Sequence, residues 1–198
     1  GYGGVDHVLA SGRNVNLLVL DTEVYSNTGG QASKATPMGA VAKFAESGMR
    51  AGKKNLGYLC MNYGNVYVAQ ISMGANRVQT QQAFMEAMAY EGPSLIIAYS
   101  PCIAHGINMM ESAKIAKDAV ECGYWPLYRF NPSRPKGERF SWDAHEPRGD
   151  FLNFVQNERR FSALYDRAPD EADSLLELAR KESQRNWRFL QKLGALMN

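Results

Sequence analysis

The residues best suited to chemistry lie in one short stretch, residues 20–31, which reads Leu-Asp-Thr-Glu-Val-Tyr-Ser-Asn-Thr-Gly-Gly-Gln. It collects hydroxyl, carboxylate and amide oxygens ahead of two glycines. Oxygen donors of this kind suit a Mg²⁺ ion that holds a diphosphate, and Thr22, a neighbouring backbone carbonyl and Asn27 are the candidates. Gly29 and Gly30 would let backbone N–H groups approach phosphate. From the residues alone, a plain polar turn remains the favoured interpretation, because Asn-Thr-Gly-Gly is also a common turn sequence.

A second candidate is Cys102, which follows the apolar run at residues 94–100 and precedes His105. Thiolates bind iron–sulfur clusters, but a 4Fe–4S cluster needs four of them, and the chain has three cysteines and no Cys-x-x-Cys pair. Taken alone, Cys102 is better explained as a small buried hydrophobe. His105 would cap or orient the helix after it, or lie next to a cluster bound at Cys102, and of these the capping role is favoured. We expect Cys60 and Cys122 to be structural.

Apolar runs predict the strands that position these loops. Residues 15–20 and 94–100 suit strands covered on both faces of a parallel sheet, and residues 66–73 and 125–130 are weaker candidates. One predicted helix begins near Gln79 and has an apolar side formed by Val78, Phe84, Met85, Met88 and Ala89. A second ends before Gly123 and carries Ile107, Met110, Ala113, Ala116 and Val120. Strands that alternate with helices predict an α/β fold.

The last third of the chain has a different character. Residues 131–150 contain three prolines and two glycines and predict an extended connection. Asp150 can cap a helix that carries Phe151, Phe154, Val155, Phe161 and Leu164. Pro169 suits the first turn of a final helix. The apolar stripe of that helix is typical of a core or subunit contact and comprises Leu175, Leu178, Ala179, Trp187, Leu190, Leu193 and Met197.

Composition narrows the class of protein. The chain has 198 residues, of which 45% are hydrophobic, and a formal net charge of +2. This near-neutral balance argues against binding to nucleic acid or an anionic membrane. The longest apolar runs are far shorter than the roughly 20 residues that span a bilayer, and three cysteines suit a reducing cytoplasm. We therefore expect a cytoplasmic protein that binds a small molecule or another protein, and the start at Gly1 predicts a cut end rather than a signal peptide.

The stretch Asn-Leu-Leu-Val-Leu-Asp-Thr-Glu-Val-Tyr-Ser-Asn-Thr-Gly-Gly-Gln-Ala-Ser-Lys-Ala-Thr-Pro at residues 16–37 resembles part of a known motif. It is similar to the second half of the thiamine-diphosphate motif of pyruvate:ferredoxin (flavodoxin) oxidoreductases. The likeness continues through residues 67–75 and 100–106 and covers nearly the whole chain. It implies a thiamine-diphosphate-binding α/β fold with a mainly parallel sheet and helices on both faces, formed by residues 1–130. Residues 131–198 would form a linker and a helical C-terminal segment.

The resemblance also implies roles for individual residues. Thr22, through its hydroxyl, and Val24, through its backbone carbonyl, match Mg²⁺ ligands. The cofactor-binding stretch would comprise Thr22, Glu23, Val24, Tyr25, Ser26 and Asn27, of which Asn27 would face the reacting centre as the catalytic residue. Asp21 is interpreted as a strand-end residue. Cys102 matches the fourth ligand of the 4Fe–4S cluster nearest the thiamine, and the other three cysteines would come from a segment upstream.

The implied reaction is oxidative decarboxylation of pyruvate with coenzyme A, which gives acetyl-CoA, CO₂ and two electrons for ferredoxin or flavodoxin. The implied partners are the remainder of the same polypeptide and a second copy in a homodimer. One feature departs from the family pattern: a Gly-Asp-Gly whose Asp completes the Mg²⁺ ligands is expected just before Gly1, and the chain contains none. We therefore expect this chain alone to bind Mg-thiamine diphosphate poorly and to be inactive.

Two other functions remain open from the sequence. A non-redox thiamine-diphosphate decarboxylase or synthase would share the cofactor loop but would have no use for a thiolate at Cys102. A non-catalytic α/β interaction module would use the helical last third to dock a partner, and its loop at residues 20–31 would be only a turn.

Overall fold

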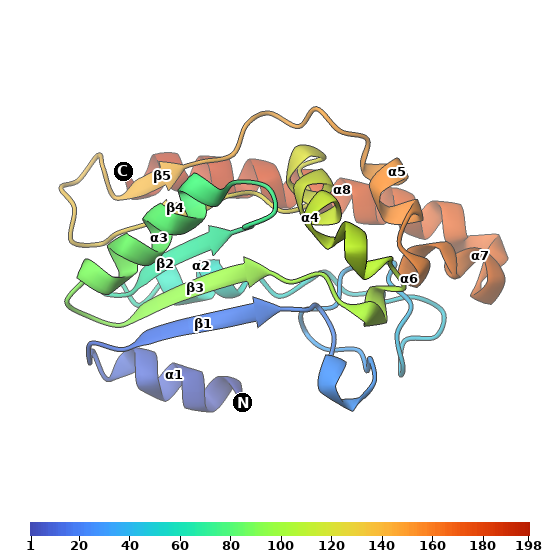
Figure 1. Ribbon diagram of the computed structural model, residues 1–198, viewed down its shortest axis with the longest axis horizontal. Coiled ribbons are helices and arrows are strands. Elements are labelled where there is room, and N and C mark those ends of the chain that lie inside the picture. The colour runs from blue at the N-terminus through green and yellow to red at the C-terminus, as the bar shows by residue number, and fades with distance from the viewer.

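Five strands form one sheet in the computed structural model, which describes residues 1–198 (Figure 1). Across the sheet, β1 (Asn16–Asp21) is followed by β3 (Ser94–Tyr99), β2 (Tyr67–Ile71), β4 (Tyr128–Phe130) and β5 (Phe140–Trp142). The first three are parallel, and β4 and β5 are added antiparallel. Because Asp21 pairs with Tyr99, β1 and β3 end side by side. The two candidate loops therefore leave the sheet at the same edge.

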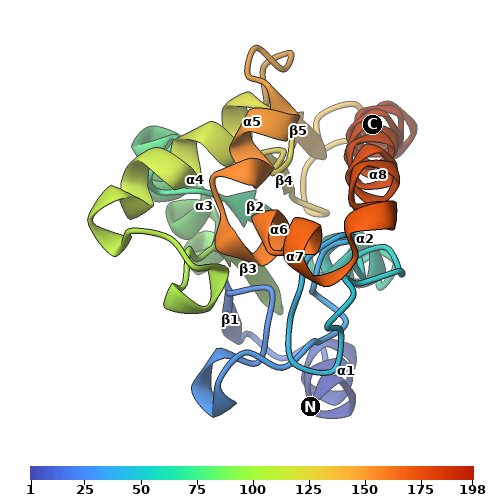
Figure 2. The same ribbon diagram turned by 90° about the vertical axis from the view of Figure 1, so that its right-hand side faces the viewer.

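Helices lie on both faces of this sheet, but β1 was expected to be covered on both faces and is open on one, where Leu18 is 50% exposed and Leu20 63% exposed. The helices are α1 (Tyr2–Ala10), α2 (Leu56–Met61), α3 (Arg77–Ala89), α4 (Ser112–Glu121), α5 (Phe151–Gln156), α6 (Arg159–Ser162), α7 (Leu164–Arg167) and α8 (Pro169–Met197). Three 3₁₀ turns, η1 (Ser26–Thr28), η2 (Ile103–His105) and η3 (Met109–Glu111), lie in the loops. Figure 2 shows α3 and α4 on one side of the sheet and α1, α2 and α8 on the other. The predicted α/β class, with a mostly parallel sheet and a helical C-terminal segment, is confirmed.

Local signals in the sequence explain several of these boundaries. The Asp150 carboxylate accepts the backbone N–H of Leu152 at the start of α5, as predicted. Gly123 follows the end of α4 with φ +80°, a conformation that favours glycine. Pro169 lies in the first turn of α8, where its missing N–H leaves no bond unmade.

The buried face of α3 differs from the predicted one. Val78, Met85 and Met88 are exposed, although they were expected to face the core. The buried positions of α3 are instead Gln79, Thr80, Ala83 and Ala87. Two alanines let the helix axis lie close to the sheet, and larger side chains at these positions would hold it away. Small buried residues carry little hydrophobic signal, so the larger exposed residues misled the prediction.

Other segments also depart from the expected boundaries. Helix α4 begins only at Ser112, so Ile107 and Met110 precede it, and Met110 is exposed. The single helix expected after Asp150 is three short helices, α5, α6 and α7. Strand β5 lies within the connection expected to be extended, and α1 and α2 lie where no helix was predicted.

The core joins the two halves of the chain. Val68 and Leu95 from the sheet belong to the same buried apolar cluster as Leu176 and Leu190 of α8. A domain boundary near residue 130 stays a prediction.

The longest helix, α8, is rich in charged residues, and no helix has the length and apolar character needed to cross a membrane.

Candidate functional site

The loop after β1 brings together the two atoms predicted to bind Mg²⁺. Thr22 Oγ1 lies 3.1 Å from the carbonyl oxygen of Val24 and 3.4 Å from Oγ of Ser26. Two neighbouring ligands of an octahedral ion with metal–oxygen distances of about 2.1 Å would lie about 3 Å apart. Thr22 and Val24 are both half-buried. In the structure the Thr22 hydroxyl donates a hydrogen bond to the Val24 carbonyl, and this spacing is also the one that two ligands of a single Mg²⁺ ion would have.

Glu23, between these two residues, has a backbone conformation that is unusual for its type. Its φ is +59°, in the left-handed region that non-glycine residues seldom adopt. Three contacts hold it there: its N–H donates to Asp21 Oδ1 at 2.9 Å, its carbonyl accepts from Thr36 Oγ1 at 2.6 Å, and its side chain is buried. The shape of the loop is therefore imposed by its anchors rather than by local preference.

The anchor below the loop is a buried group of charged and polar side chains, which we call the Glu23 cluster. The Glu23 carboxylate lies 2.6 Å from Lys53 Nζ, 2.8 Å from the Tyr124 hydroxyl and 2.8 Å from Arg160 Nη2. Burial alone would raise the pKa of Glu23, but the charges of Lys53 and Arg160 lower this pKa to about 2. The cluster comprises Asp21, Glu23, Lys53, Tyr99, His105, Tyr124, Glu158 and Arg160.

Arg160 joins the two acidic residues at the centre of this cluster. Its side chain is only 1% exposed, and its Nε donates to Glu158 Oε2 at 2.6 Å. Burial would lower the pKa of Arg160, but Glu158 and Glu23 raise it well above its ordinary value. Its Nη2 approaches Glu23 outside hydrogen-bonding geometry, and its Nη1 has no partner. The sequence analysis missed both Glu158 and Arg160, because no local pattern separates a buried charge from the exposed charges around it.

Asp21 and Lys53 complete the cluster on the side of β1. Asp21 is the last residue of β1, which confirms its interpretation as a strand-end residue, and its Oδ2 lies 2.7 Å from Lys53 Nζ. Burial would lower the pKa of Lys53, but Glu23 and Asp21 raise it. The Asp21 and Glu23 carboxylates therefore share the ammonium group of Lys53.

The tip of the loop presents Asn27 on η1. Asn27 and Tyr25 are exposed, so both can meet a ligand or another part of the protein. Gly29 and Gly30 both have positive φ, as their type allows. Their N–H groups donate to the carbonyls of Ser26 and Tyr25 within the loop. The two glycines thus close the turn with their own amides, and the approach of other backbone N–H groups of this loop to a phosphate stays a prediction.

The capping role expected of His105 is taken by Cys102. The Cys102 sulfur accepts the N–H of Ala104 at 3.4 Å and caps η2. His105 does not cap this turn. It is fully buried, with Nε2 2.8 Å from the carbonyl oxygen of Thr22 and Nδ1 3.8 Å from Glu158 Oε1. Burial and the charge of Arg160 together lower the pKa of His105 to about 4, although the charge of Glu23 acts in the opposite direction.

The three cysteines lie in different surroundings. Cys60 and Cys122 are buried, and burial raises their pKa values to about 11 and about 12, as expected for structural thiols. Cys102 is half-buried at the rim of the sheet. No group of three or more His, Cys, Asp or Glu side chains in the chain is arranged to hold a metal ion. A cluster at Cys102 would therefore need its other ligands from elsewhere.

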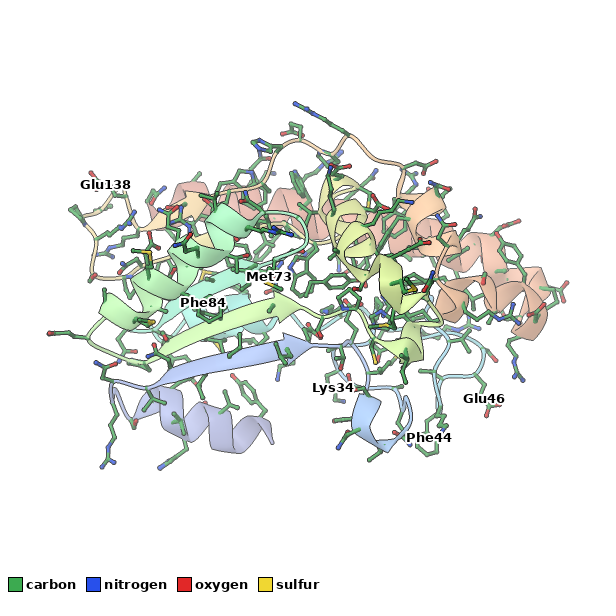
Figure 3. All side chains as sticks on the ribbon, in the orientation of Figure 1. Lys34, Phe44, Glu46, Met73, Phe84 and Glu138 are labelled. Atoms are coloured by element: carbon green, nitrogen blue, oxygen red, sulfur yellow. The ribbon has the colours of Figure 1, made fainter.

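The Cys102 turn and the Thr22 loop are in contact. A Cβ atom placed on Gly30 would lie 3.6 Å from Cβ of Ala104. Exposed apolar side chains surround the same end of the sheet, and Figure 3 shows Phe44 beside η1. Phe44 is 88% exposed and Ile103 is 76% exposed. The rim that carries the predicted ligands is thus apolar as well as polar.

A cavity of about 100 Å³ lies behind the Glu23 cluster, on the side of α8. Lys53, Trp125 and Asn186 are among its walls, and neither Thr22 nor Asn27 lines it. The Asn55 amide donates to Asn186 Oδ1 at 3.0 Å, so the polar groups on this wall bond to one another. Asp21 and Glu23 also line the cavity, so it reaches the start of the loop after β1 from below without containing the predicted ligands Thr22 and Val24.

The chain has sequence relatives among characterised proteins. No protein-family model matches it. The chain is 53% identical over 196 residues to the pyruvate:ferredoxin oxidoreductase of Moorella thermoacetica, with 98% of this chain and 17% of that protein covered. It is also 53% identical to the pyruvate-flavodoxin oxidoreductase of a Nostoc species and 52% identical to that of Klebsiella pneumoniae, covering 16% of each. The chain therefore spans about a sixth of the length of these relatives.

One solved structure overlaps part of the chain. It is a 2-oxoglutarate:ferredoxin oxidoreductase from Magnetococcus marinus with 2-oxoglutarate, coenzyme A and succinyl-CoA bound. The match has 25% identity and a TM-score of 0.49, and covers 52% of this chain and 35% of the other.

The fold and site define an α/β chain that gathers the Thr22 hydroxyl, the Val24 carbonyl and the Cys102 thiol at the carboxyl ends of two parallel strands. Its sequence relatives identify it further. The chain is homologous to one segment of the pyruvate:ferredoxin and pyruvate-flavodoxin oxidoreductases.

Proposed function

We propose that this chain forms the magnesium–diphosphate floor and supplies one cluster ligand of a pyruvate:ferredoxin or pyruvate:flavodoxin oxidoreductase. The observation that carries the proposal is the meeting of two loops at one edge of the sheet. Thr22 Oγ1 and the Val24 carbonyl lie 3.1 Å apart, and His105 binds the Thr22 carbonyl three residues after Cys102. The sequence identity of 53% to the pyruvate:ferredoxin oxidoreductase of Moorella thermoacetica, over 98% of the chain, supports the same assignment.

The residues of the loop fit Mg-thiamine diphosphate. Thr22 would bind Mg²⁺ through its hydroxyl and Val24 through its carbonyl, and residues 22–27 would lie against the cofactor. When bound, thiamine diphosphate would supply the nucleophilic carbon and the electron sink that decarboxylation of a 2-oxo acid requires. Asn27 is exposed at the tip of the loop and would donate a hydrogen bond to the substrate oxygen.

The remaining ligands and substrates would bind outside this chain. Its two ligand oxygens are neutral, so a carboxylate from the rest of the polypeptide would complete the Mg²⁺ site. Cys102 would be one of four thiolates of a 4Fe–4S cluster. Coenzyme A, ferredoxin or flavodoxin, and a second copy in a homodimer would contact the longer enzyme, which we expect to be cytoplasmic.

The role of Cys102 is tested by Cys102→Ala in the enzyme that contains this chain. We expect the loss of one cluster, seen in the iron content and in the electron paramagnetic resonance of the reduced enzyme, and loss of pyruvate oxidation. Cys60→Ala is the matched control, because Cys60 is buried in α2 and should leave the iron content unchanged. Unchanged iron content and an unchanged rate of pyruvate oxidation in Cys102→Ala would exclude this role for Cys102.

The metal site is tested by Thr22→Val, which removes one oxygen and keeps the shape of the side chain. Calorimetry of the intact enzyme with Mg²⁺ and thiamine diphosphate should show affinity reduced at least about tenfold, since even outer contacts of a metal site are worth this much. Thr80→Val is the control, because its hydroxyl bonds only the carbonyl of Asn76 in α3. A parent enzyme that gives no heat of binding would instead support an interaction module.

A further inference from the structure

His105 connects two sites that lie far apart in the sequence. Its Nε2 is 2.8 Å from the Thr22 carbonyl oxygen, and its own backbone N–H donates to the carbonyl of Cys102 at 2.9 Å. A carbonyl oxygen can only accept, so Nε2 carries a proton. The imidazole therefore donates one hydrogen bond across the gap between the Cys102 turn and the Thr22 loop.

The connection joins the two groups of atoms that the proposed function uses as ligands. On one side, Ala104 donates its N–H to the Cys102 sulfur and is the residue before His105. On the other side, Thr22 places its hydroxyl beside the Val24 carbonyl. A short path of hydrogen bonds thus runs from the sulfur of one loop to the oxygens of the other.

Neighbouring side chains restrict the position of the His105 ring. It is fully buried, its centroid lies 6.5 Å from that of Tyr99, and its Nδ1 faces Glu158 at 3.8 Å. Gly106 follows with φ +69°, and a Cβ there would lie 2.2 Å from Cβ of Arg159. The turn is therefore pressed against α6 and has little freedom to shift relative to the Thr22 loop.

We propose that His105 is a positioning residue that sets the Thr22 loop and the Cys102 sulfur at a fixed separation and orientation. The proposal rests on the proposed function, because the two sites it positions are the metal–diphosphate floor and the cluster ligand. His105 contacts neither the metal nor the cluster. It acts through the Thr22 carbonyl and through the turn that holds Cys102.

The test compares His105→Leu with His105→Gln in the intact enzyme. Glutamine can place an amide N–H close to where histidine places Nε2–H, whereas leucine keeps bulk and removes the donor. We expect His105→Leu to bind Mg-thiamine diphosphate about 10- to 100-fold more weakly by calorimetry, the usual range for a lost outer contact of a metal site. The reduced-cluster resonance should change in the same variant while its iron content stays at the wild-type value. His105→Gln should restore the affinity to within about threefold of wild type.

His145→Leu is the matched control, because His145 is exposed and should change neither reading. Unchanged affinity and an unchanged resonance in folded His105→Leu would overturn the proposal. Equal losses in His105→Leu and His105→Gln would also overturn it, since they would show a packing role without the hydrogen bond. Failure of the proposed function has a different signature, because the wild-type enzyme itself would then lack iron or bind no cofactor.

Discussion

The chain contains two groups of buried or nearly buried charges, and they are built differently. In the Glu23 cluster, Arg160 is 1% exposed and one of its terminal nitrogens has no partner. In the second group, Arg129 binds both Asp143 oxygens at 2.8 and 2.9 Å and also reaches Glu86. We call this second group, with Arg134 and Tyr67, the Arg129 cluster; Arg134 and Tyr67 bond Glu86 at 2.8 and 2.9 Å.

The difference between the two clusters follows from their positions. The Arg129 cluster links α3 to β4 and the segment after β5, and its side chains keep 9–15% exposure at Arg129, Glu86 and Asp143. None of its buried polar atoms lacks a hydrogen-bond partner, as expected of a contact that only stabilises the fold. The Glu23 cluster lies under the loop of the proposed metal site and keeps Glu23 at φ +59°. Buried charges, the strained backbone of Glu23 and the unpaired nitrogen of Arg160 thus lie together under the proposed metal site. Such features are expected where the surrounding structure holds a loop in a conformation that it would not adopt alone.

The largest effect should come from Arg160→Met, which removes the positive charge at the centre of the Glu23 cluster. Two buried carboxylates, Glu23 and Glu158, would lose their shared partner, and breaking a buried pair in this way costs about 3–5 kcal/mol. The measurement is the free energy of unfolding in urea. The double variant with Glu23→Gln should recover part of the loss, and a single-variant loss below about 1 kcal/mol would mean that water replaces the guanidinium.

The second-largest effect is expected from acid, which should weaken the Glu23 cluster. The pKa of His105 is about 4 in the folded chain, below the ordinary 6.5, because of burial and Arg160. The unfolded chain therefore takes up a proton first, and stability falls as the pH drops from about 6.5 to 4, by up to about 3 kcal/mol. Lys53 and Arg160, acting against burial, lower the pKa of Glu23 to about 2, so its contribution is lost between about pH 4.5 and 2.

Unfolding free energies at pH 7, 5.5 and 4 check this expectation. His105→Gln should flatten the profile between pH 6.5 and 4, and the control His145→Gln should leave it as in the wild type. A His105→Gln profile as steep as that of the wild type would assign the acid sensitivity to other groups.

A smaller effect is expected from Arg129→Lys in the Arg129 cluster. Lysine keeps the charge but cannot bind both oxygens of Asp143 in a planar fork. The loss of one or two charge-assisted hydrogen bonds should cost about 1–3 kcal/mol in urea unfolding. Thiamine-diphosphate affinity of the intact enzyme should stay unchanged, and a fall in that affinity would show that the two clusters are coupled.

The smallest effect is expected at an exposed pair. Arg50 and Glu171 form an ion pair whose side chains are 54% and 55% exposed. Solvent and salt screen such a pair, so Glu171→Gln should leave the melting temperature unchanged within error. A clear drop would mean that this contact holds the loop around Arg50 to α8 more firmly than its exposure indicates.

Much of the framework follows from local sequence patterns. The runs around residues 15–20 and 94–100 are strands, and Asp150, Gly123 and Pro169 mark helix ends as predicted. Helix α3 was placed correctly, but its buried face was not, because Ala83 and Ala87 pack closely without a strong apolar signal.

The candidate site was only partly accessible from the sequence. The loop at residues 20–31 and Cys102 could be found by residue type, and the resemblance supplied their expected roles. The cluster beneath them could not, since Lys53, Tyr124 and Arg160 approach Glu23 from distant parts of the chain and share no spacing. His105 was assigned a local role because its true partner, Thr22, lies 83 residues earlier.

The long reach of the contacts around Glu23 has a consequence for biosynthesis. Tyr124, which bonds Glu23, is made 101 residues after it, and Arg160 is made later still. While the chain emerges from the ribosome, Glu23 has no guanidinium to offset its burial, so the strained turn cannot yet be stable. The loop should therefore take its final shape only after α6 has been synthesised and docked, and binding of the proposed cofactor would follow that step.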